Sequence, residues 1–282
     1  MENIFDFSYK SDMDWDAPRL SISSVLEMLS EPFDRDGVAE KTFMKHYNNE
    51  SSEYYHKSKD EIIMMWEAKG ALSRKYGTLL DEYIGTILTK TPEELEIWKL
   101  DNNVEYDERL NGLCKSFDDF YELIMSSGDV EYVDREKSLY YKDGDHYFNG
   151  RFDCMFHNKR TNKYIIIDWK SSGEIEKVQN KFTSMLKGPM CLYPALNWYT
   201  YSMQLSFYKF TLLNGGYIKD PDIKIGENDI ETLIVNLPGK MIKESGKWFQ
   251  VHKTAFPYDE DLIKKTLSFA YKKYTLLNAK NK

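Results

Sequence analysis

The sequence predicts an α/β fold, with a mixed central sheet flanked by helices and preceded by a helical N-terminal region. Three observations predict it. Helix-start signals precede amphipathic runs throughout residues 1–130, three strand-like segments separated by two turns begin near residue 131, and a helix, two strands and a last helix follow. We therefore expect residues 1–130 to form a helical region packed on the core, and residues 131–282 to form that core, within one continuous domain.

The N-terminal helices are predicted mainly from their caps. Ser58 with Glu61, and Thr91 with Glu94, stand three residues apart ahead of apolar runs, which is the capping-box pattern. Gly77 opens a further helical run, so the helices before and after it are expected to be separate. Together these signals predict helices over residues 21–30, 58–70, 76–90, 91–100 and 106–127.

The strands of the core are predicted from β-type runs bounded by turn residues. Residues 131–141, 146–156 and 163–170 are typical of three consecutive strands. Asp143–Gly144 is a hairpin signal between the first two, and the polar segment 157–162 supplies the second turn. Beyond them we expect a helix over 196–214, strands over 231–239 and 246–253, and a C-terminal helix over 259–277.

The composition is that of a soluble globular protein. Hydrophobic residues make up 41% of the 282 residues and charged residues 30%. No apolar run is long enough to span a membrane, and the acidic, polar N-terminus is no signal peptide, so we expect a cytoplasmic location in a bacterial or phage-infected cell. The net charge of −8 disfavours a long nonspecific contact with nucleic acid unless a local basic groove or bound divalent cations offset it.

Several cofactor classes are excluded by the absence of their motifs. Cys114, Cys154 and Cys191 are far apart and form no CxxC pair, which argues against a zinc site or an iron–sulfur cluster. No Walker-type phosphate loop is present, so no nucleotide cofactor is expected. The histidines show no ligand spacing, and His146 and His157, at strand ends, are expected to be solvated.

The strand over 163–170 ends in two opposite charges, Asp168 and Lys170, after a run of isoleucines. Because side chains alternate along a strand, both face the same side of the sheet. Asp153 lies on the neighbouring strand, and two carboxylates on adjacent strands can share a hard divalent cation such as Mg²⁺ or Mn²⁺. The alternative is a salt-bridged strand end with no further role, since buried charges need a partner of some kind.

Three segments together resemble one nuclease superfamily. "NGRFD", with Gly150 and Asp153, is similar to the G-x-x-D motif of PD-(D/E)XK nucleases, and "IIIDWKSS" is similar to their D-x-K motif. "YSMQLSFYKF" resembles the Q-x-x-x-Y motif of the RecB-like branch, and its Gln204 and Tyr208, four residues apart, share a helix face. The resemblance spans roughly residues 60–215 and implies a restriction-endonuclease-like core.

An upstream segment adds to the resemblance and also departs from it. "WEAKGALSRKYGTLLDEYI" is similar to the W…G-T-x-x-H segment of RecB-like exonucleases, a group that includes the mitochondrial genome maintenance exonuclease and phage relatives. Asp81 stands where the family has His, and it is either a metal ligand or a solvent-facing residue. The adjacent Glu82 faces about 100° away on a helix. Glu136 matches an acid often found ahead of G-x-x-D, and an ion pair is an equally good interpretation of it.

The resemblance implies a metal-dependent DNA exonuclease that hydrolyses phosphodiester bonds. Asp153, Asp168 and the main-chain carbonyl of Trp169 would hold Mg²⁺ or Mn²⁺. Lys170 would orient or deprotonate the attacking water or stabilise the charge on the phosphate, and Gln204 would position this assembly.

Substrate contacts are expected from residues close to these in the sequence. Tyr208, Tyr201 and Ser171 are the candidates, since tyrosines can stack on unpaired bases. The expected substrate is DNA with single-stranded or frayed ends. Two alternatives remain: a structure- or sequence-specific endonuclease with the same core, and an inactive scaffold that binds nucleic acid without cutting it.

Overall fold

The structure is a computed structural model, and it describes residues 4–8, 14, 16–173, 175, 177–179, 183–220 and 222–280. The chain divides into two compact units, which are considered separately. Residues Met1–Glu31 and Asn111–Lys282 form the first, and Pro32–Leu110 form the second. None of the described helices combines the length and apolarity that a membrane span requires.

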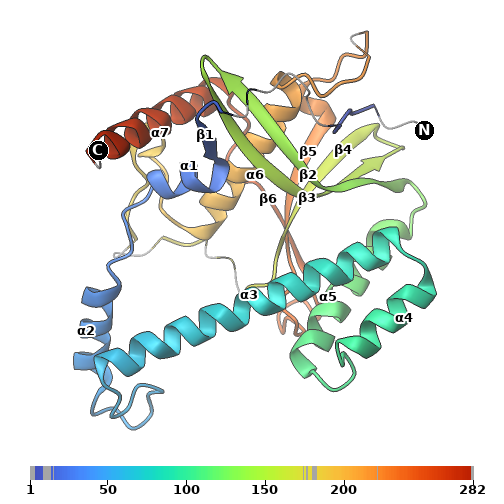
Figure 1. The fold of residues 1–282 in the computed structure, drawn as a ribbon. Helices are drawn as coiled ribbons and strands as arrows, with labels where there is room; N and C mark the ends of the chain where they lie inside the picture. Colours follow the sequence, from blue (N-terminus) through green and yellow to red (C-terminus); the bar gives the residue numbers. More distant parts are fainter. Residues whose placement is uncertain are drawn as a thin grey trace. The chain divides into compact units, whose positions relative to one another are not determined.

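The first unit is built on a mixed sheet of six strands (Figure 1). Its path is β1-β3-β4-β5-β6, and β2 pairs with β3 in addition. The β1–β3 and β4–β5 pairings are parallel and the others are antiparallel. The strands are β1 (Arg19–Ser21), β2 (Val130–Asp143), β3 (His146–Asn158), β4 (Lys163–Lys170), β5 (Ile230–Asn236) and β6 (Gln250–Lys253).

Two strands share one edge of β3. Because β2 pairs with β3 from end to end, β1 and β4 must both use the opposite edge. β1 pairs with Tyr147 to Asn149, and β4 pairs with Cys154 to Asn158. The segment from Gly150 to Asp153 therefore lies between the two pairings, where the edge of β3 is open to side chains.

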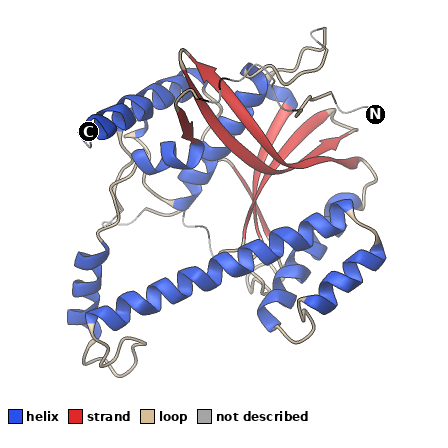
Figure 2. Ribbon diagram, viewed as in Figure 1, coloured by secondary structure: helices blue, strands red, loops and turns tan. Residues whose placement is uncertain are grey.

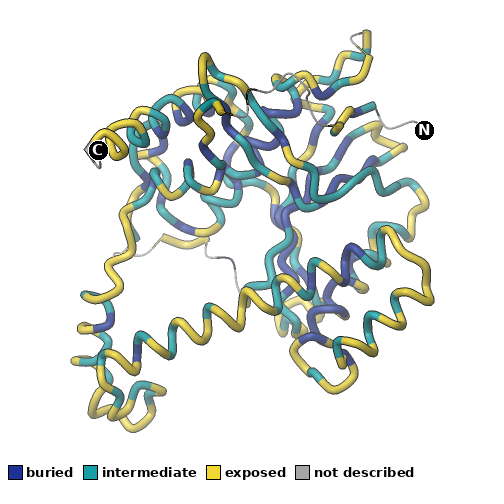
Figure 3. Tube along the Cα trace, viewed as in Figure 1, coloured by how far each residue is buried: buried dark blue, intermediate teal, exposed yellow. Residues whose placement is uncertain are grey.

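Helices cover both faces of this sheet. Trp169 packs edge-on against Phe117 and Phe120 of α5, while Lys170 lies under the Tyr201 ring of α6. Since side chains alternate along β4, α5 and α6 lie on opposite faces. The buried stretches of the chain follow the sheet and α6 (Figure 3). The helices of this unit are α1 (Ile22–Met28), α6 (Asn197–Asn214), α7 (Glu260–Lys280) and, from Asn111 on, α5 (Glu108–Met125).

The second unit contains helices and loops, and no strand among its described residues (Figure 2). Its helices are α2 (Arg35–His46), α3 (Lys59–Thr89) and α4 (Pro92–Asp101). Both predicted capping boxes are present: Ser58 with Glu61 begins α3, and Thr91 with Glu94 begins α4. These caps satisfy main-chain N–H groups that the first helical turn leaves unpaired.

The expected break near Gly77 is wrong. α3 is one helix of 31 residues that runs through both Gly70 and Gly77. A glycine inside a helix costs only about 1 kcal/mol relative to alanine. Burial of Ile62 near one end of α3, and of Tyr83 and Ile84 near the other, outweighs that cost because packing decides helix length more than propensity does.

The division into units also differs from the boundary expected at residue 130. β1 and α1, near the N-terminus, belong to the unit of the sheet because β1 pairs with β3. α5 contributes Phe117 and Phe120 to one face of that sheet. The three-strand meander, the helix after it and the C-terminal helix are confirmed as elements, whereas β6 is shorter than predicted.

Candidate active site

The site begins where β3 and β4 separate. Their ladder ends at the pair Cys154 and Ile167. The next pair in the same register would be Asp153 and Asp168. Instead of a ladder bond, the main-chain N–H of Trp169 donates to Oδ2 of Asp153 at 2.8 Å. The carboxylate of the G-x-x-D segment is thus fixed against the main chain of the D-x-K segment.

Asp168 and Lys170 form a buried ion pair. Asp168 is 1% exposed, and its Oδ2 lies 2.7 Å from Nζ of Lys170. Burial raises the pKa of the Asp168 carboxyl, and the Lys170 ammonium opposes this effect. Burial disfavours the Lys170 ammonium too, but the charges of Asp168 and Asp153 outweigh it and raise the pKa of Lys170. Lys170 is therefore held as a cation beside two carboxyl groups.

α6 closes the site from one side. Nε2 of Gln204 donates to the hydroxyl oxygen of Tyr208 at 2.7 Å, so the two predicted residues share a helix face and contact each other. The Tyr208 hydroxyl also bonds the main chain of Arg151, within the open edge of β3. The centre of the Tyr201 ring, one turn before Gln204 on α6, lies 4.3 Å from Nζ of Lys170.

The packing of the Tyr208 ring against β3 requires glycine at position 150. A Cβ atom there would lie 2.6 Å from Cε1 of Tyr208 and 3.0 Å from Cγ1 of Ile22. Real Cβ atoms do not approach ring atoms that closely, so only glycine lets the tyrosine lie against β3. The glycine of the G-x-x-D motif and the tyrosine of the Q-x-x-x-Y motif are thus contact partners, and Tyr208, at 4% exposed, is a packing residue of the site.

Two other predicted residues lie at the margin of this cluster. Ser171 is half-buried and follows Lys170 directly, where β4 ends. The indole of Trp169 packs against α5, and the role of its carbonyl as a metal ligand stays a prediction. Asp81 is half-buried on α3 in the second unit, so its role as a ligand also stays a prediction.

Glu136 forms an ion pair with Arg151, with 2.8 Å between Oε2 and Nη1. The ion pair that we considered as an alternative role for this acid is therefore present. Glu136 also has a positive φ of 53°, a conformation that costs a residue other than glycine about 1–2 kcal/mol. The strain lies on β2 across from Asp153, next to the site.

The expectation of solvated histidines is wrong for His157, which is 1% exposed. Its two ring nitrogens lie 3.2 Å from Oε1 of Glu131 and 3.1 Å from Oδ1 of Asn162. The half-buried His146 stacks on the ring of Tyr271. Both are structural residues of the sheet and its edges.

Sequence reasoning missed two polar residues beside the site. Asn236 ends β5, is fully buried and pairs in register with Lys170. His252 is 9% exposed and lies on β6, the last strand of the sheet path, where it pairs with Ile234 of β5. The signal for Asn236 was available, because an apolar strand run that ends in a polar residue is the same pattern that singled out Asp168. The four-residue strand of His252 carries no such signal.

The kinds of side chain at the site determine which metal ion it could hold. Among the described residues, no three His, Cys, Asp or Glu side chains converge as a metal-binding group. Asp153 and Asp168 are two hard oxygen donors, and Mg²⁺ is commonly held by one or two carboxylates while it keeps several waters. The residues present therefore fit Mg²⁺ or Mn²⁺ and do not fit a structural zinc site, which needs four protein ligands.

No protein-family model and no curated protein matches the sequence. Among solved structures, the chain is similar to the crystal structure of a "Putative exonuclease" from Eubacterium rectale, with a TM-score of 0.44 and 12% sequence identity. The match covers 97% of this chain and 87% of that chain. A similarity this distant does not indicate a function.

Proposed function

We propose that the protein is a metal-dependent nuclease that hydrolyses phosphodiester bonds of DNA. The observation that supports this most is the local arrangement at the divergence of β3 and β4. There Asp153 is fixed by the N–H of Trp169, and Asp168 lies beside Lys170. Two carboxylates and one cation on a single sheet face form the set of groups that metal-assisted hydrolysis requires. The resemblance to the PD-(D/E)XK superfamily and its RecB-like branch belongs to the same proposal.

Each residue has a part that follows from its contacts. Asp153 and Asp168 would hold Mg²⁺ or Mn²⁺, which would supply positive charge and an acidified water. Lys170 would place its ammonium next to the developing charge of the phosphate or orient the attacking water. Gln204 and Tyr208 would act indirectly, because they brace the main chain around Arg151.

An exonuclease acting on single-stranded or frayed ends is the form that we favour. Tyr201 is half-buried and lies over Lys170, where a tyrosine ring can meet an unpaired base. Ser171 is the other candidate for a substrate contact. An endonuclease with the same site is the second candidate, since the chemistry at the scissile phosphate is identical and only access differs.

The test compares end-labelled linear DNA with closed-circular single-stranded DNA, in Mg²⁺, Mn²⁺ or EDTA. We expect metal-dependent loss of the linear DNA alone, and its abolition in Lys170→Ala. Lys163→Ala is the matched control, because Lys163 lies at the other end of β4 and pairs with Glu231 at 2.8 Å. Cleavage of the circle would indicate an endonuclease. Absence of cleavage with every metal, in a chain that still binds DNA, would overturn the proposal in favour of an inactive scaffold.

A further inference from the structure

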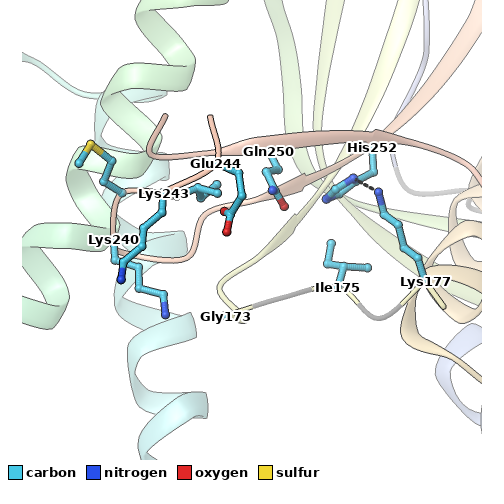
Figure 4. Close-up of a pocket in the computed structure, with 10 residues that line it drawn as sticks. Gly173, Ile175, Lys177, Lys240, Lys243, Glu244, Gln250 and His252 are labelled. Carbon is cyan, nitrogen blue, oxygen red and sulfur yellow. Dashed lines mark hydrogen bonds between the residues drawn. The ribbon is translucent and has the colours of Figure 1, made fainter. Parts of the chain in front are cut away.

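A polar cavity of about 450 Å³ lies in the first unit, next to the end of β4. It lies between Gly173, Ile175 and Lys177, which follow β4, the loop that precedes β6, and β6 itself (Figure 4). Its described lining includes Lys177, Lys240, Lys243, Glu244, Gln250 and His252.

The sheet register places this cavity on the same face as the candidate active site. Lys170 pairs with Asn236 on β5, and Asn236 pairs with Gln250 on β6. In the same way, Asp168 pairs with Ile234 on β5, and Ile234 pairs with His252 on β6. Registered partners project to the same face of a sheet. Adjacent strands are about 4.8 Å apart, so Gln250 lies about 10 Å across the sheet from Lys170.

His252 presents a hydrogen-bond donor to the cavity. Its Nδ1 lies 2.5 Å from Nζ of Lys177 (Figure 4), and an ammonium group can only donate, so Nδ1 accepts and Nε2 carries the proton. His252 is 9% exposed, and within the described part of the chain its Nε2 has no hydrogen-bond partner. A buried donor without a partner costs about 1–3 kcal/mol, which a ligand with an acceptor oxygen would recover.

The charge of the cavity indicates the class of that ligand. Lys177, Lys240 and Lys243 line it, and between described residues none of the three forms an ion pair. Among the described residues of the lining, Glu244 is the acidic one. Three ammonium groups, an imidazole N–H and the Gln250 amide are donors suited to an oxyanion. Three lysines against one glutamate give the described part of the lining an excess of positive charge, in a chain whose net charge is −8.

We propose that the cavity binds a phosphate group of the strand that the active site cuts, next to the scissile phosphate. This inference rests on the proposed nuclease function and adds a subsite to it. The cavity shares a sheet face with Asp168 and Lys170, so a strand whose scissile phosphate lies at Lys170 carries a neighbouring phosphate over Gln250. There the lysines supply charge, and His252 supplies a directed hydrogen bond.

The main test measures how salt weakens binding of a single-stranded oligothymidine in EDTA, where no cleavage occurs. The variant is Lys240→Ala with Lys243→Ala in the full chain. The matched control is Lys219→Ala with Lys224→Ala, which removes the same charge from two exposed lysines outside the cavity. Each phosphate contact on a single strand contributes about 0.7 to the slope of log K against log salt. We expect the slope to fall by about 0.7 in the cavity variant alone, and equal slopes in both variants would overturn the subsite.

A second measurement identifies the source of the phosphate. The imidazole signals of His252 are followed by NMR while inorganic phosphate replaces chloride at constant ionic strength, and then with the oligothymidine. We expect the oligothymidine to shift the Nε2 signal in the wild type. If the His252 signals respond to inorganic phosphate alone, and the salt dependence of oligothymidine binding is unchanged in the cavity variant, the cavity does not hold a phosphate of a DNA strand. That result would overturn the proposal. A reduced slope in the cavity variant of a chain that cuts no DNA would overturn the nuclease proposal, and the cavity would then be supported only as a site that binds a phosphate of DNA.

Discussion

The main-chain N–H of Trp169 donates to the carboxylate of Asp153, although the two residues belong to strands whose ladder has already ended. The bond holds the ends of β3 and β4 at a fixed separation without a further backbone pair. The Asp153 carboxylate accepts this bond and lies near the Asp168–Lys170 pair, so it has a structural task here and, under the proposed function, a chemical one. Substitutions can separate the two.

Asp153→Asn and Asp153→Ala separate these tasks. The amide oxygen of asparagine can still accept from Trp169, so we expect this variant to unfold at nearly the wild-type temperature. Alanine leaves the N–H without its partner and should cost about 1 kcal/mol more. Both variants remove the charge, and both should lose at least about a hundredfold in cleavage rate, a loss within the range of single catalytic groups. Thermal unfolding and a cleavage assay provide the comparison, and an active Asp153→Asn would contradict it.

Gly150→Ala should disturb the site through Tyr208. The added Cβ would lie 2.6 Å from the tyrosine ring, and forced overpacking of this kind costs about 1–3 kcal/mol. Gly226→Ala is the control, because the nearest atom to its added Cβ is 3.6 Å away. We expect a lower unfolding temperature and slower cleavage for Gly150→Ala only. Equal stability of the two variants would show that Tyr208 does not press on β3.

Divalent cations should stabilise the fold through the two carboxylates. A ligand at about 100 times its Kd adds about 2.7 kcal/mol to the free energy of unfolding. We expect Mg²⁺ to raise the unfolding temperature of the wild type, and Asp168→Asn to abolish this rise. Lys170→Met leaves Asp168 buried beside no cation and should cost about 3 kcal/mol in EDTA. A Mg²⁺ response that survives in Asp168→Asn would place the ion elsewhere.

Stability should depend on the protonation of His252. Burial and the neighbouring Lys177 lower the pKa of His252 from 6.5 to about 4. The unfolded chain therefore binds a proton that the folded chain does not, between these two values. The contribution of neutral His252 is complete above pH 6.5 and is lost as the pH falls towards 4.

The measurement for His252 is a difference between two proteins. Urea unfolding of the wild type and of His252→Gln is followed from pH 7 to pH 4. The charged groups of the described lining, Lys177, Lys240, Lys243 and Glu244, are present in both proteins, so the difference isolates His252. We expect the advantage of the wild type to shrink as the pH falls, and a constant difference would show that the imidazole titrates normally.

Gly70→Ala should stabilise the second unit. Gly70 lies inside α3, and the nearest atom to its added Cβ is the end of the flexible Arg74 side chain at 3.4 Å. Alanine in a helix interior is favoured over glycine by up to about 1 kcal/mol. Circular dichroism during thermal unfolding should show the gain. A loss of stability would mean that α3 bends at Gly70 in solution.

Local signals in the sequence were sufficient for much of this structure. The caps at Ser58 and Thr91 and the Asp143–Gly144 turn each depend on a few consecutive residues, and each element that they bound is present. The contact between Gln204 and Tyr208 was predictable as well, because helix geometry alone brings residues four apart together.

The remaining features depend on residues far apart in the chain. β1 has only three residues, and it forms because β3 offers an open edge to Leu20 and its neighbours. The need for Gly150 arises from a ring that lies 58 residues later, at Tyr208. The pairing of Lys177 with His252 joins residues 75 apart in the sequence. Periodicity does not encode such contacts, and the motifs single out Gly150 and Tyr208 without indicating that the two touch. Only the assembled fold reveals these contacts.

The sheet topology has a consequence for the order of folding. β2, β3 and β4 are joined by short turns, so their contacts close small loops at low entropic cost. β5 pairs with β4 in parallel, so this pairing needs a crossover and closes a loop of the whole chain length between Lys170 and Ile230. Asp153 and Asp168 should therefore meet on an early hairpin, before the strand that carries His252 is in place. Amide protection in pulsed hydrogen exchange should appear along the hairpins first, so a nascent chain would acquire its two carboxylates before the lysine-lined cavity exists.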